Sequence, residues 1–416
     1  MTPIDLLAAV VFGLALVHTF AAKAFERWAR RSPRHAGLLH LLGEVEVVFG
    51  FWAIVLVLLM ALVVGGAQAI EYAETRQYTE PLFVFVIMVV AASRPVLDAV
   101  RAMVGSLARH APLRPAVAQV WLCLAVVPLI GSLVTEPAAM SLAALMLAPL
   151  VFEAALPEGL KYAALGALFV NVSIGGTLTS FAAPPVLMVA SAWQWDSAFM
   201  ATHFGWKAAL AVLVNASVMT AALARHLPST PAPDAAQSAA RVPAAVSAIH
   251  LVFLAAVVAF AHHPVVFLGI FLLFLGYTQA YARHQSPLLL KEALLVGFFL
   301  SGLVVLGGLQ QWWLQPIVSQ LQPTALFFGA LGLTALTDNA ALTYLGSLID
   351  GLSHESRYML VAGAVAGGGL TVIANAPNPA GVTLLKRGFK DGSIGALGLL
   401  LGALPPTVVA AACFWL

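Results

Sequence analysis

The sequence predicts an all-α polytopic membrane protein. Of its 416 residues, 61% are hydrophobic and 9% are charged, and the mean hydropathy is +0.96, whereas a soluble domain carries about 25% charged residues. Apolar runs of roughly 20 residues recur along the whole chain, and each is long enough to cross a hydrocarbon core about 30 Å thick. The scattered Lys and Arg form no basic stripe, so the expected partner is the lipid bilayer and not a nucleic acid.

About ten transmembrane helices are expected from the apolar segments. Their ranges are 4–22, 41–64, 82–108, 161–195, 204–224, 245–261, 264–282, 291–308, 358–386 and 393–416. Two longer segments, 116–155 and 316–350, each have a polar kink near the middle. Such a kink is typical of a re-entrant hairpin that enters and leaves the membrane by the same face.

The basic residues agree with this layout of ten crossings and two hairpins. Arg76, Lys207 and Arg357 fall on one side. Fifteen others fall on the opposite side, namely Lys23, Arg27, Arg30, Arg31, Arg34, Arg109, Arg114, Lys161, Arg225, Arg241, Arg283, Lys291, Lys386, Arg387 and Lys390. The positive-inside rule therefore places the basic loops in the cytoplasm and both termini outside.

A stretch without apolar periodicity, RHLPSTPAPDAAQSAARVPA at 225–244, is predicted to be a cytoplasmic linker. It separates an N-terminal repeat, 1–224, from a C-terminal repeat, 245–416. Each repeat would hold one hairpin, 116–155 or 316–350, and one broken helix, 161–195 or 358–386. Because the two hairpins enter from opposite faces, the repeats have inverted topology, which is typical of secondary transporters.

The hairpin centres of the two halves can be aligned. SLVTEPAAMSLAAL at 132–145 lies over TALTDNAALTYLGS at 334–347. This alignment pairs Thr135 with Thr337, Glu136 with Asp338, and Pro137 with Asn339. An ionised Asp at the centre of a membrane helix costs about 2.5 to 3.5 kcal/mol, so an acid at both hairpin centres points to a function.

Each half also has a Gly-rich interruption inside an apolar segment. The sequences IGGTLTSFAAPP at 174–185 and AGGGLTVIANAPNP at 366–379 share the core Gly-Gly-x-Leu-Thr and are followed by prolines. Gly weakens a helix, and Pro lacks the backbone donor and clashes one turn back. Unwound backbone survives in a membrane where it lines a cavity or binds something.

Together, these motifs predict an all-oxygen cage for a hard cation. The candidate groups are the backbone around Gly175, Gly176, Gly368 and Gly369, the hydroxyls of Thr135, Thr179, Thr337 and Thr371, the amides of Asn339, Asn375 and Asn378, and the carboxylates of Asp338 and Glu136. A bound sodium ion or proton would offset the cost of an ionised acid. Exchange of one for the other would couple their transport.

Each acid also has a purely structural explanation. Asp338 could cap the second hairpin arm, because carboxylates favour helix N-termini, and we expect it both to cap and to bind. Glu136 precedes Pro137, and an acid before Pro also makes an ordinary helix start.

Other charges lie near or inside the apolar segments. Glu44 and Glu46, near the cytoplasmic entrance of the second crossing, are two residues apart and cannot share a helix face. One of them would point inward as a possible proton relay or ion-pair partner, and the other would reach the surface. Arg94 and Asp98, four residues apart, are predicted to form a structural ion pair.

The motifs LTDNAAL and NVSIGGTLTSFAAPP resemble those of the NhaD-type sodium/proton antiporters. These belong to the ion transporter superfamily, together with arsenite efflux permeases and sodium-coupled citrate and dicarboxylate carriers. The resemblance implies an elevator-like movement against a dimeric scaffold. It also implies a sodium site at Asp338, Asn339 and Thr337, with Thr177, Thr179 and Thr371 around the breaks. The first hairpin departs from the family pattern, because Thr135-Glu136-Pro137 replaces an Asn-bearing motif.

The function that the sequence favours is sodium/proton antiport, with the two ions competing for Asp338 and for Glu136. Two acidic hairpin tips would repel an anionic substrate in a low dielectric. The alternatives are a sodium-coupled transporter of a small anion, either a carboxylate or arsenite-like, and a non-coupled channel or scaffold. Nothing matches a P-loop, a zinc signature or a nucleophile elbow, so we expect neither an enzyme nor a cofactor. An Ala-rich chain without a cleavable signal suits a multi-pass protein of the bacterial inner membrane.

Overall fold

A computed structural model describes residues 2–228 and 242–416, which form helices joined by turns without a β-strand. The all-α prediction is therefore confirmed for this part of the chain. The predicted linker at 225–244 lies mostly outside the described residues.

Five helical segments of the described chain are long and apolar enough to cross a membrane. They are Pro3–Ala21, Val45–Val63, Ser197–Leu223, Leu290–Gly307 and Ala396–Trp415. The number rises to seven if two bent helix pairs each count as one span. This is fewer than the ten expected, because several apolar segments are divided into helices of 10–17 residues. Composition predicts the apolar runs but not where tertiary packing bends or interrupts them.

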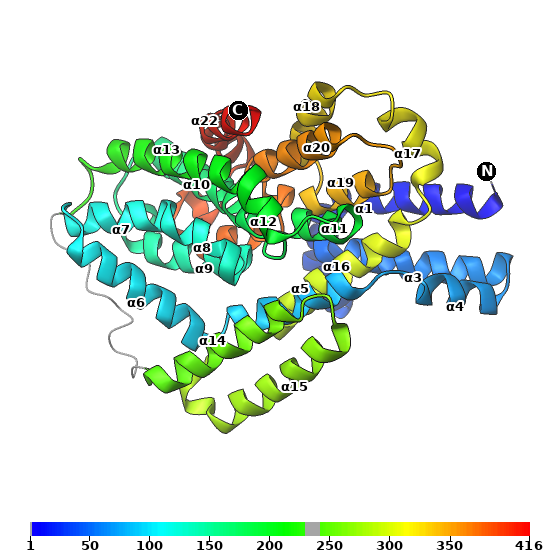
Figure 1. Cartoon of the computed structure of the whole chain (residues 1–416), viewed down its shortest axis with the longest axis horizontal. Coiled ribbons are helices and arrows are strands. Elements are labelled where there is room, and N and C mark those ends of the chain that lie inside the picture. Colours follow the sequence, from blue (N-terminus) through cyan, green and yellow to red (C-terminus); the bar gives the residue numbers. More distant parts are fainter. Residues whose placement is uncertain (1, 229–241) are drawn as a thin grey trace.

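The first of two helix groups surrounds the contact between α3 and α16 (Figure 1). We call this group the first bundle. Its members are α1 (Pro3–Arg31), α2 (Ala36–Gly43), α3 (Val45–Val63), α4 (Gly66–Glu74), α5 (Thr79–Ala91), α6 (Arg94–His110), α14 (Ala244–Ala259), α15 (Pro264–Ala280) and α16 (Leu290–Gly307). Helices α3 and α16 approach closely because neither has a side chain at the crossing, where Gly302 lies directly against the backbone of Gly50.

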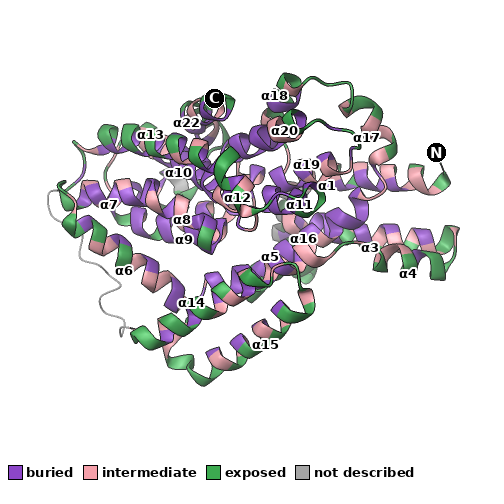
Figure 2. Cartoon of the chain, in the orientation of Figure 1, coloured by how far each residue is buried: buried purple, intermediate pink, exposed green. Residues whose placement is uncertain are grey.

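The second bundle surrounds α10, whose residues from Ala164 to Gly175 are all buried (Figure 2). Its members are α7 (Pro115–Leu124), α8 (Val126–Val134), α9 (Glu136–Leu147), α10 (Glu158–Gly175), α11 (Pro184–Trp193), α12 (Ser197–Met200), α13 (Trp206–Leu223), α18 (Pro323–Thr334), α19 (Asn339–Ser347), α20 (His354–Gly367), α21 (Asn378–Leu385) and α22 (Ala396–Trp415). Helix α17 (Gln311–Val318) connects the two bundles through the chain. Gly166 of α10 packs against the backbone of Gly402 in α22.

Helices from the two halves of the sequence interlock inside the second bundle. Helix α9 of the first half packs against α21 of the second half, and α11 of the first half packs against α19 of the second. Both pairs join the arm that follows a predicted hairpin centre to the helix that follows a Gly-rich break in the other half. The two acidic motifs and the two breaks are thereby brought to the same region of the fold.

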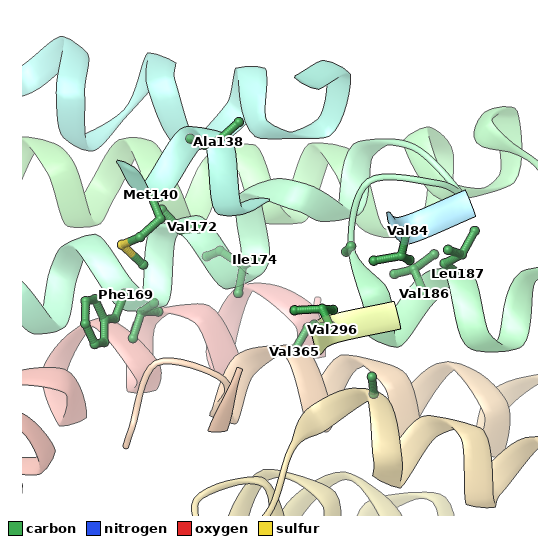
Figure 3. Packing of buried hydrophobic residues seen from close by; sticks show 14 of the residues in the cluster. Val84, Ala138, Met140, Phe169, Val172, Ile174, Val186, Leu187, Val296 and Val365 are labelled. Atoms are coloured by element: carbon green, nitrogen blue, oxygen red, sulfur yellow. The ribbon is translucent and has the colours of Figure 1, made fainter. Parts of the chain in front are cut away.

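The bundles meet at two places, where α6 of the first packs against α7 and α9 of the second, and where α5 and α16 pack against α9, α11 and α19. Val84 of α5 lies beside Val186 and Leu187 of α11 (Figure 3). The rings of Phe83 in α5 and Phe181 in the first break have centroids 6.5 Å apart. The contacts between the bundles are thus mainly apolar.

The predicted crossing at 82–108 is two helices, because α5 and α6 meet at an angle of 63°. The predicted ion pair lies in α6, where Arg94 Nε is 3.3 Å from Asp98 Oδ2. Asp98 also faces Arg101 at 3.5 Å. The sequence spacing was therefore sufficient to identify the pair, although it could not show the bend beside it.

Candidate functional site

The tip of the first hairpin is a single residue. Helix α8 ends at Val134 and α9 begins at Glu136, so Thr135 alone makes the turn, with φ 144° and ψ 155°. Its hydroxyl caps α9 by accepting a hydrogen bond from the Ala138 amide at 3.4 Å. The predicted helix start is thus confirmed, but the cap is Thr135 and Glu136 is the first helical residue.

The Glu136 side chain is completely buried. Its Oε2 accepts a hydrogen bond from Asn375 Nδ2 at 2.8 Å. Its Oε1 has no hydrogen-bond partner in the described chain and lies over Gly176, where any β-carbon would collide with the carboxylate. The carboxylate therefore joins the first hairpin to both Gly-rich breaks while one of its oxygens stays available.

The second hairpin tip is longer and holds its acid differently. Residues 335–338 connect α18 to α19, and Asp338 is the N-cap of α19 with an ordinary φ of −75°. Its Oδ1 accepts hydrogen bonds from the amides of Ala340 and Ala341 at 2.8 and 3.2 Å. The capping role expected for Asp338 is confirmed. The side chain is half-buried, as is that of the neighbouring Thr337.

Both Gly-rich segments interrupt a helix as predicted. Helix α10 ends at Gly175 and α11 begins at Pro184, whereas α20 ends at Gly367 and α21 begins at Asn378. Side chains satisfy the freed carbonyls of the second break, since Asn378 Nδ2 donates to Gly368 O at 2.7 Å and to Thr371 O at 2.9 Å. Gly369 packs directly on the backbone of Val170, because a β-carbon on Gly369 would lie 2.5 Å from the Val170 nitrogen.

Equivalent contacts recur in the two halves. Thr179 Oγ1 donates to Ser132 O at 2.7 Å, and Thr371 Oγ1 donates to Ala335 O at 2.9 Å. A β-carbon on Gly175 would lie 2.6 Å from Pro128 O, and one on Gly367 would lie 2.5 Å from Leu331 O. In the same way, Gly176 faces Glu136 and Gly368 faces Asn339.

These contacts correct the sequence alignment of the hairpins by one residue. They match Ser132 with Ala335 instead of Thr334, and Glu136 with Asn339 instead of Asp338. The N-cap Asp338 is then the counterpart of the N-cap Thr135. The alignment was wrong because it followed the shared Thr-acid pair, whereas the contact that each residue makes in the fold depends on where the helix begins.

The threonines around the breaks use their hydroxyls to hold backbone. Thr177 Oγ1 donates to Ile174 O at 2.7 Å, and Thr179 and Thr371 donate to the hairpin carbonyls described above. A donating hydroxyl keeps lone pairs for a further contact. Thr179 and Thr371 attach each break to its own hairpin, whereas Thr177 holds the end of α10.

The acidic and amide side chains, in contrast, retain unpaired oxygen atoms. Four such buried atoms have no hydrogen-bond partner among the described residues, namely Glu136 Oε1, Asn339 Oδ1, Asn375 Oδ1 and Asn378 Oδ1. A buried polar atom without a partner costs free energy. A hard cation accepts such oxygens as ligands, and of the four only Glu136 Oε1 belongs to a group that can also take up a proton.

Glu44 and Glu46, two residues apart at the start of α3, have different surroundings. Glu44 lies between α2 and α3 and forms an ion pair with Lys291 of α16 at 3.3 Å. Glu46 lies in the first turn of α3 and is half-buried.

The site is nearly closed towards the first bundle. A cleft of about 10 Å³ is lined by the first hairpin, by residues of both breaks, by α5 and by Val296 of α16. Thr135 and Ala376 border it on one side, and Ile87 and Met88 on the other. That volume is barely enough for one water molecule, so α5 packs closely against the turn at Thr135.

Sequence reasoning missed three hydroxyl residues of this region. Ser132 Oγ donates to Gly175 O at 2.7 Å and accepts from the Leu178 amide at 3.0 Å. Ser173 Oγ donates to Val365 O at 2.8 Å beside Gly368, and Thr334 is buried. Ser132 is a hydroxyl residue next to the acidic motif of the first hairpin, and that position was the signal that could have identified it.

The comparisons with known proteins identify a family and no individual relative. In the described residues, no three His, Cys, Asp or Glu side chains form a cluster that could hold a metal ion. A search of curated proteins finds no match. A family described as "Putative Na+/H+ antiporter" matches residues 3–416. The chain has the apolar helices of a multi-pass membrane protein and belongs to the family described as "Putative Na+/H+ antiporter", which is a family of transporters.

Proposed function

We propose that the protein exchanges Na+ for H+ and that Glu136 is the group at which the two ions compete. The observation that supports this most directly is the fully buried carboxylate with one oxygen unpaired in the described chain and facing Gly176. A carboxylate buried without a compensating positive charge is strongly unfavourable. Either a proton or a sodium ion removes that cost, and both would use the same oxygen.

Asp338 contributes the second negative charge of the proposed site. One of its oxygens is already occupied by two amides of α19, so it acts first as a fixed cap. Its charge would attract a cation towards Glu136. We retain Asp338, Thr337 and Asn339 as the proposed sodium ligands of the second half, with the oxygens of Asn375 and Asn378 completing the set.

Glu46 is the better candidate for a proton relay than Glu44. Glu44 is held by Lys291, whereas Glu46 is half-buried in the first turn of α3 and forms no ion pair among the described residues. A proton passing between the cytoplasmic entrance and Glu136 would then meet Glu46 and Asp338 in turn.

We infer that the two halves are inverted repeats, residues 1–224 and 245–416, each with a re-entrant hairpin. Matching contacts in the two halves support the repeat: Thr179 and Thr371 each donate to a carbonyl of their own hairpin, and Gly175 and Gly367 each pack against a carbonyl of theirs. The proposed inverted topology follows from the charge asymmetry of the loops. This arrangement resembles that of the NhaD-type antiporters.

We also infer an elevator-type movement, in which the second bundle moves against the first. The apolar junction and the position of Glu136 within the second bundle support it. The first bundle would then be the scaffold of a homodimer in the inner membrane of a bacterium. No cofactor is required, because the transported ions are the only reactants.

Reconstituted vesicles provide the test of this function. Purified protein in vesicles that contain a pH-sensitive dye should alkalinise the lumen when Na+ is added outside, without another substrate, because Na+ enters in exchange for H+ that leaves. A requirement for a carboxylate or an arsenite-like anion would favour sodium-coupled anion transport instead. A sodium current without proton movement would indicate a channel. Screening Li+ and K+ in the same assay would identify the preferred cation.

A further inference from the structure

We propose that Thr135 is a positioning residue whose strained backbone couples occupancy of Glu136 to movement of the first hairpin. The inference rests on the proposed exchange at Glu136. Among the described residues, only Thr135 and Gln194 are non-glycine residues with positive φ. Gln194 has φ 56° and ψ 40°, the common left-handed conformation. Thr135, with φ 144° and ψ 155°, lies in a region that is almost restricted to glycine.

The surroundings of Thr135 hold it in this conformation. It is the only residue between α8 and α9, which pack against each other so that Gly131 faces the β-carbon of Ala139. Its carbonyl accepts the Ala139 amide at 3.0 Å. Its side chain is 2% exposed and borders the cleft next to Met88 of α5. A β-branched residue persists in such a conformation only when the surrounding structure imposes it.

The strain acts directly on the proposed exchange group. Glu136 follows Thr135 in the chain, and its carboxylate is held by Asn375 of the other half of the molecule. If Thr135 relaxed to an ordinary φ, the first turn of α9 would rotate and carry Glu136 away from Asn375. The hydrogen bond to Asn375 and the tension in the turn therefore oppose each other. A change of ion on Glu136 shifts the balance between them.

The turn of the second hairpin has no such strained residue among those described. Four residues, 335–338, span its turn, and Asp338 has an ordinary φ of −75°. Its acid is fixed by two amides of its own helix and not by a contact across the halves. The two hairpins are thus mechanically different, and the tension is confined to the one that carries Glu136.

The test compares Thr135→Gly with Thr135→Ala in the vesicle assay. Glycine adopts the observed conformation without strain, whereas alanine keeps the β-carbon and the strain. Removing strain from the ground state lowers turnover and KM together. We expect both the kcat and the KM for Na+ of Thr135→Gly to fall, each on the order of tenfold relative to Thr135→Ala. If the hydroxyl were instead a sodium ligand, both variants would show the same increase in KM, and the proposal would be overturned.

Thermal unfolding of the purified variants tests the strain without any transport. Thr135→Gly should melt at a higher temperature than Thr135→Ala, the reverse of the order found where the backbone is unstrained. An equal or lower melting temperature overturns the proposal even if transport is impaired. Wild-type vesicles that fail to exchange the ions would contradict the proposed function, whereas wild-type exchange with unchanged kinetics in Thr135→Gly contradicts only this inference.

Gln194→Gly is the matched control. It also relieves a positive φ, but at a position on the edge of α11 outside the site. We expect Gln194→Gly to exchange Na+ for H+ with the wild-type kcat and KM. A change in Gln194→Gly equal to that in Thr135→Gly would show that the effect does not belong to the hairpin turn, and would overturn the coupling role.

Discussion

Two acids at neighbouring turns have different surroundings in this protein. Glu136 lies inside α9, fully buried, with its hydrogen bond coming from Asn375 in the other half. Asp338 precedes α19, is half-buried, and receives its hydrogen bonds from its own helix. A carboxylate fixed by its own backbone mainly stabilises the helix, whereas one held across two broken helices can respond to an ion.

The capping role of Asp338 can be measured separately from transport. Asp338→Ala removes the acceptor of two amide hydrogen bonds and should lower the free energy of unfolding by about 1 kcal/mol. Asp338→Asn should keep most of that stability, because Asn is an equally good N-cap. Thermal unfolding in detergent compares the two variants. Equal melting temperatures for Asp338→Ala and Asp338→Asn would contradict the capping role.

Asn375 should control the affinity of the site for sodium. Asn375→Leu removes the donor to Glu136 Oε2, and a hydrogen bond to a charged group contributes about 1.5 to 3 kcal/mol. The ionised carboxylate that binds Na+ becomes less favourable, so we expect the KM for Na+ to rise at least about tenfold. The rate of sodium-driven pH change over a range of Na+ concentrations measures this. An unchanged KM would show that Asn375 does not act on the site.

Single residues of the site were partly predictable from the sequence. The carboxylates and amides were identified because polar groups are rare in such apolar segments. The roles of the hydroxyls were not, since Ser132 and Thr179 are recognisable as partners only when the hairpin lies against the break. The pairing of Glu136 with Asn375, which are far apart in the chain, likewise depends on the tertiary fold.

At the scale of the helices, Gly and Pro have two different effects. At Gly175 and Pro184 they end one helix and begin the next, and this was predictable because both residues weaken a helix wherever they occur. Gly166 and Gly402 instead allow two intact helices, α10 and α22, to pack closely. This second effect can be recognised only from the fold. The 63° bend between α5 and α6 likewise depends on what each helix packs against.

The close crossing of α10 and α22 should be sensitive to added volume. Gly166→Val places its side chain into the backbone of Gly402, so we expect a lower melting temperature and a loss of folded protein. Gly269→Val in α15 is the control, because a β-carbon there has no neighbour within 4 Å. Both changes introduce a β-branched residue into a helix, so the difference between them measures packing. Equal losses would contradict the close crossing.

At the scale of the whole molecule, the site belongs to one bundle and is covered by the other. The first bundle contributes apolar side chains such as Ile87 and Met88 at the cleft. The second bundle contributes the acids, the amides and both breaks. The sequence indicated the division into halves, but the two bundles each mix both halves, because α14 to α16 join the first bundle and α18 to α22 the second.

Cross-linking tests the proposed movement between the bundles. Cys at Phe83 and Phe181, whose rings lie 6.5 Å apart across the junction, should stop exchange when joined by a bifunctional methanethiosulfonate reagent, until a reductant is added. The control pair, Cys at Phe49 and Phe299 within the first bundle, replaces rings 5.1 Å apart and should leave exchange intact when cross-linked. Full exchange in the cross-linked Phe83 and Phe181 pair would contradict an elevator movement.

The most direct test of exchange at Glu136 is the sodium-driven pH change of vesicles containing Glu136→Gln. Glutamine keeps an oxygen that can accept from Asn375, so the variant should fold, but it can neither release a proton nor carry the charge that binds Na+. Wild-type protein is expected to move protons in response to Na+, and Glu136→Gln is expected to reduce this movement to the level of protein-free vesicles. Exchange by Glu136→Gln at the wild-type rate would contradict the account.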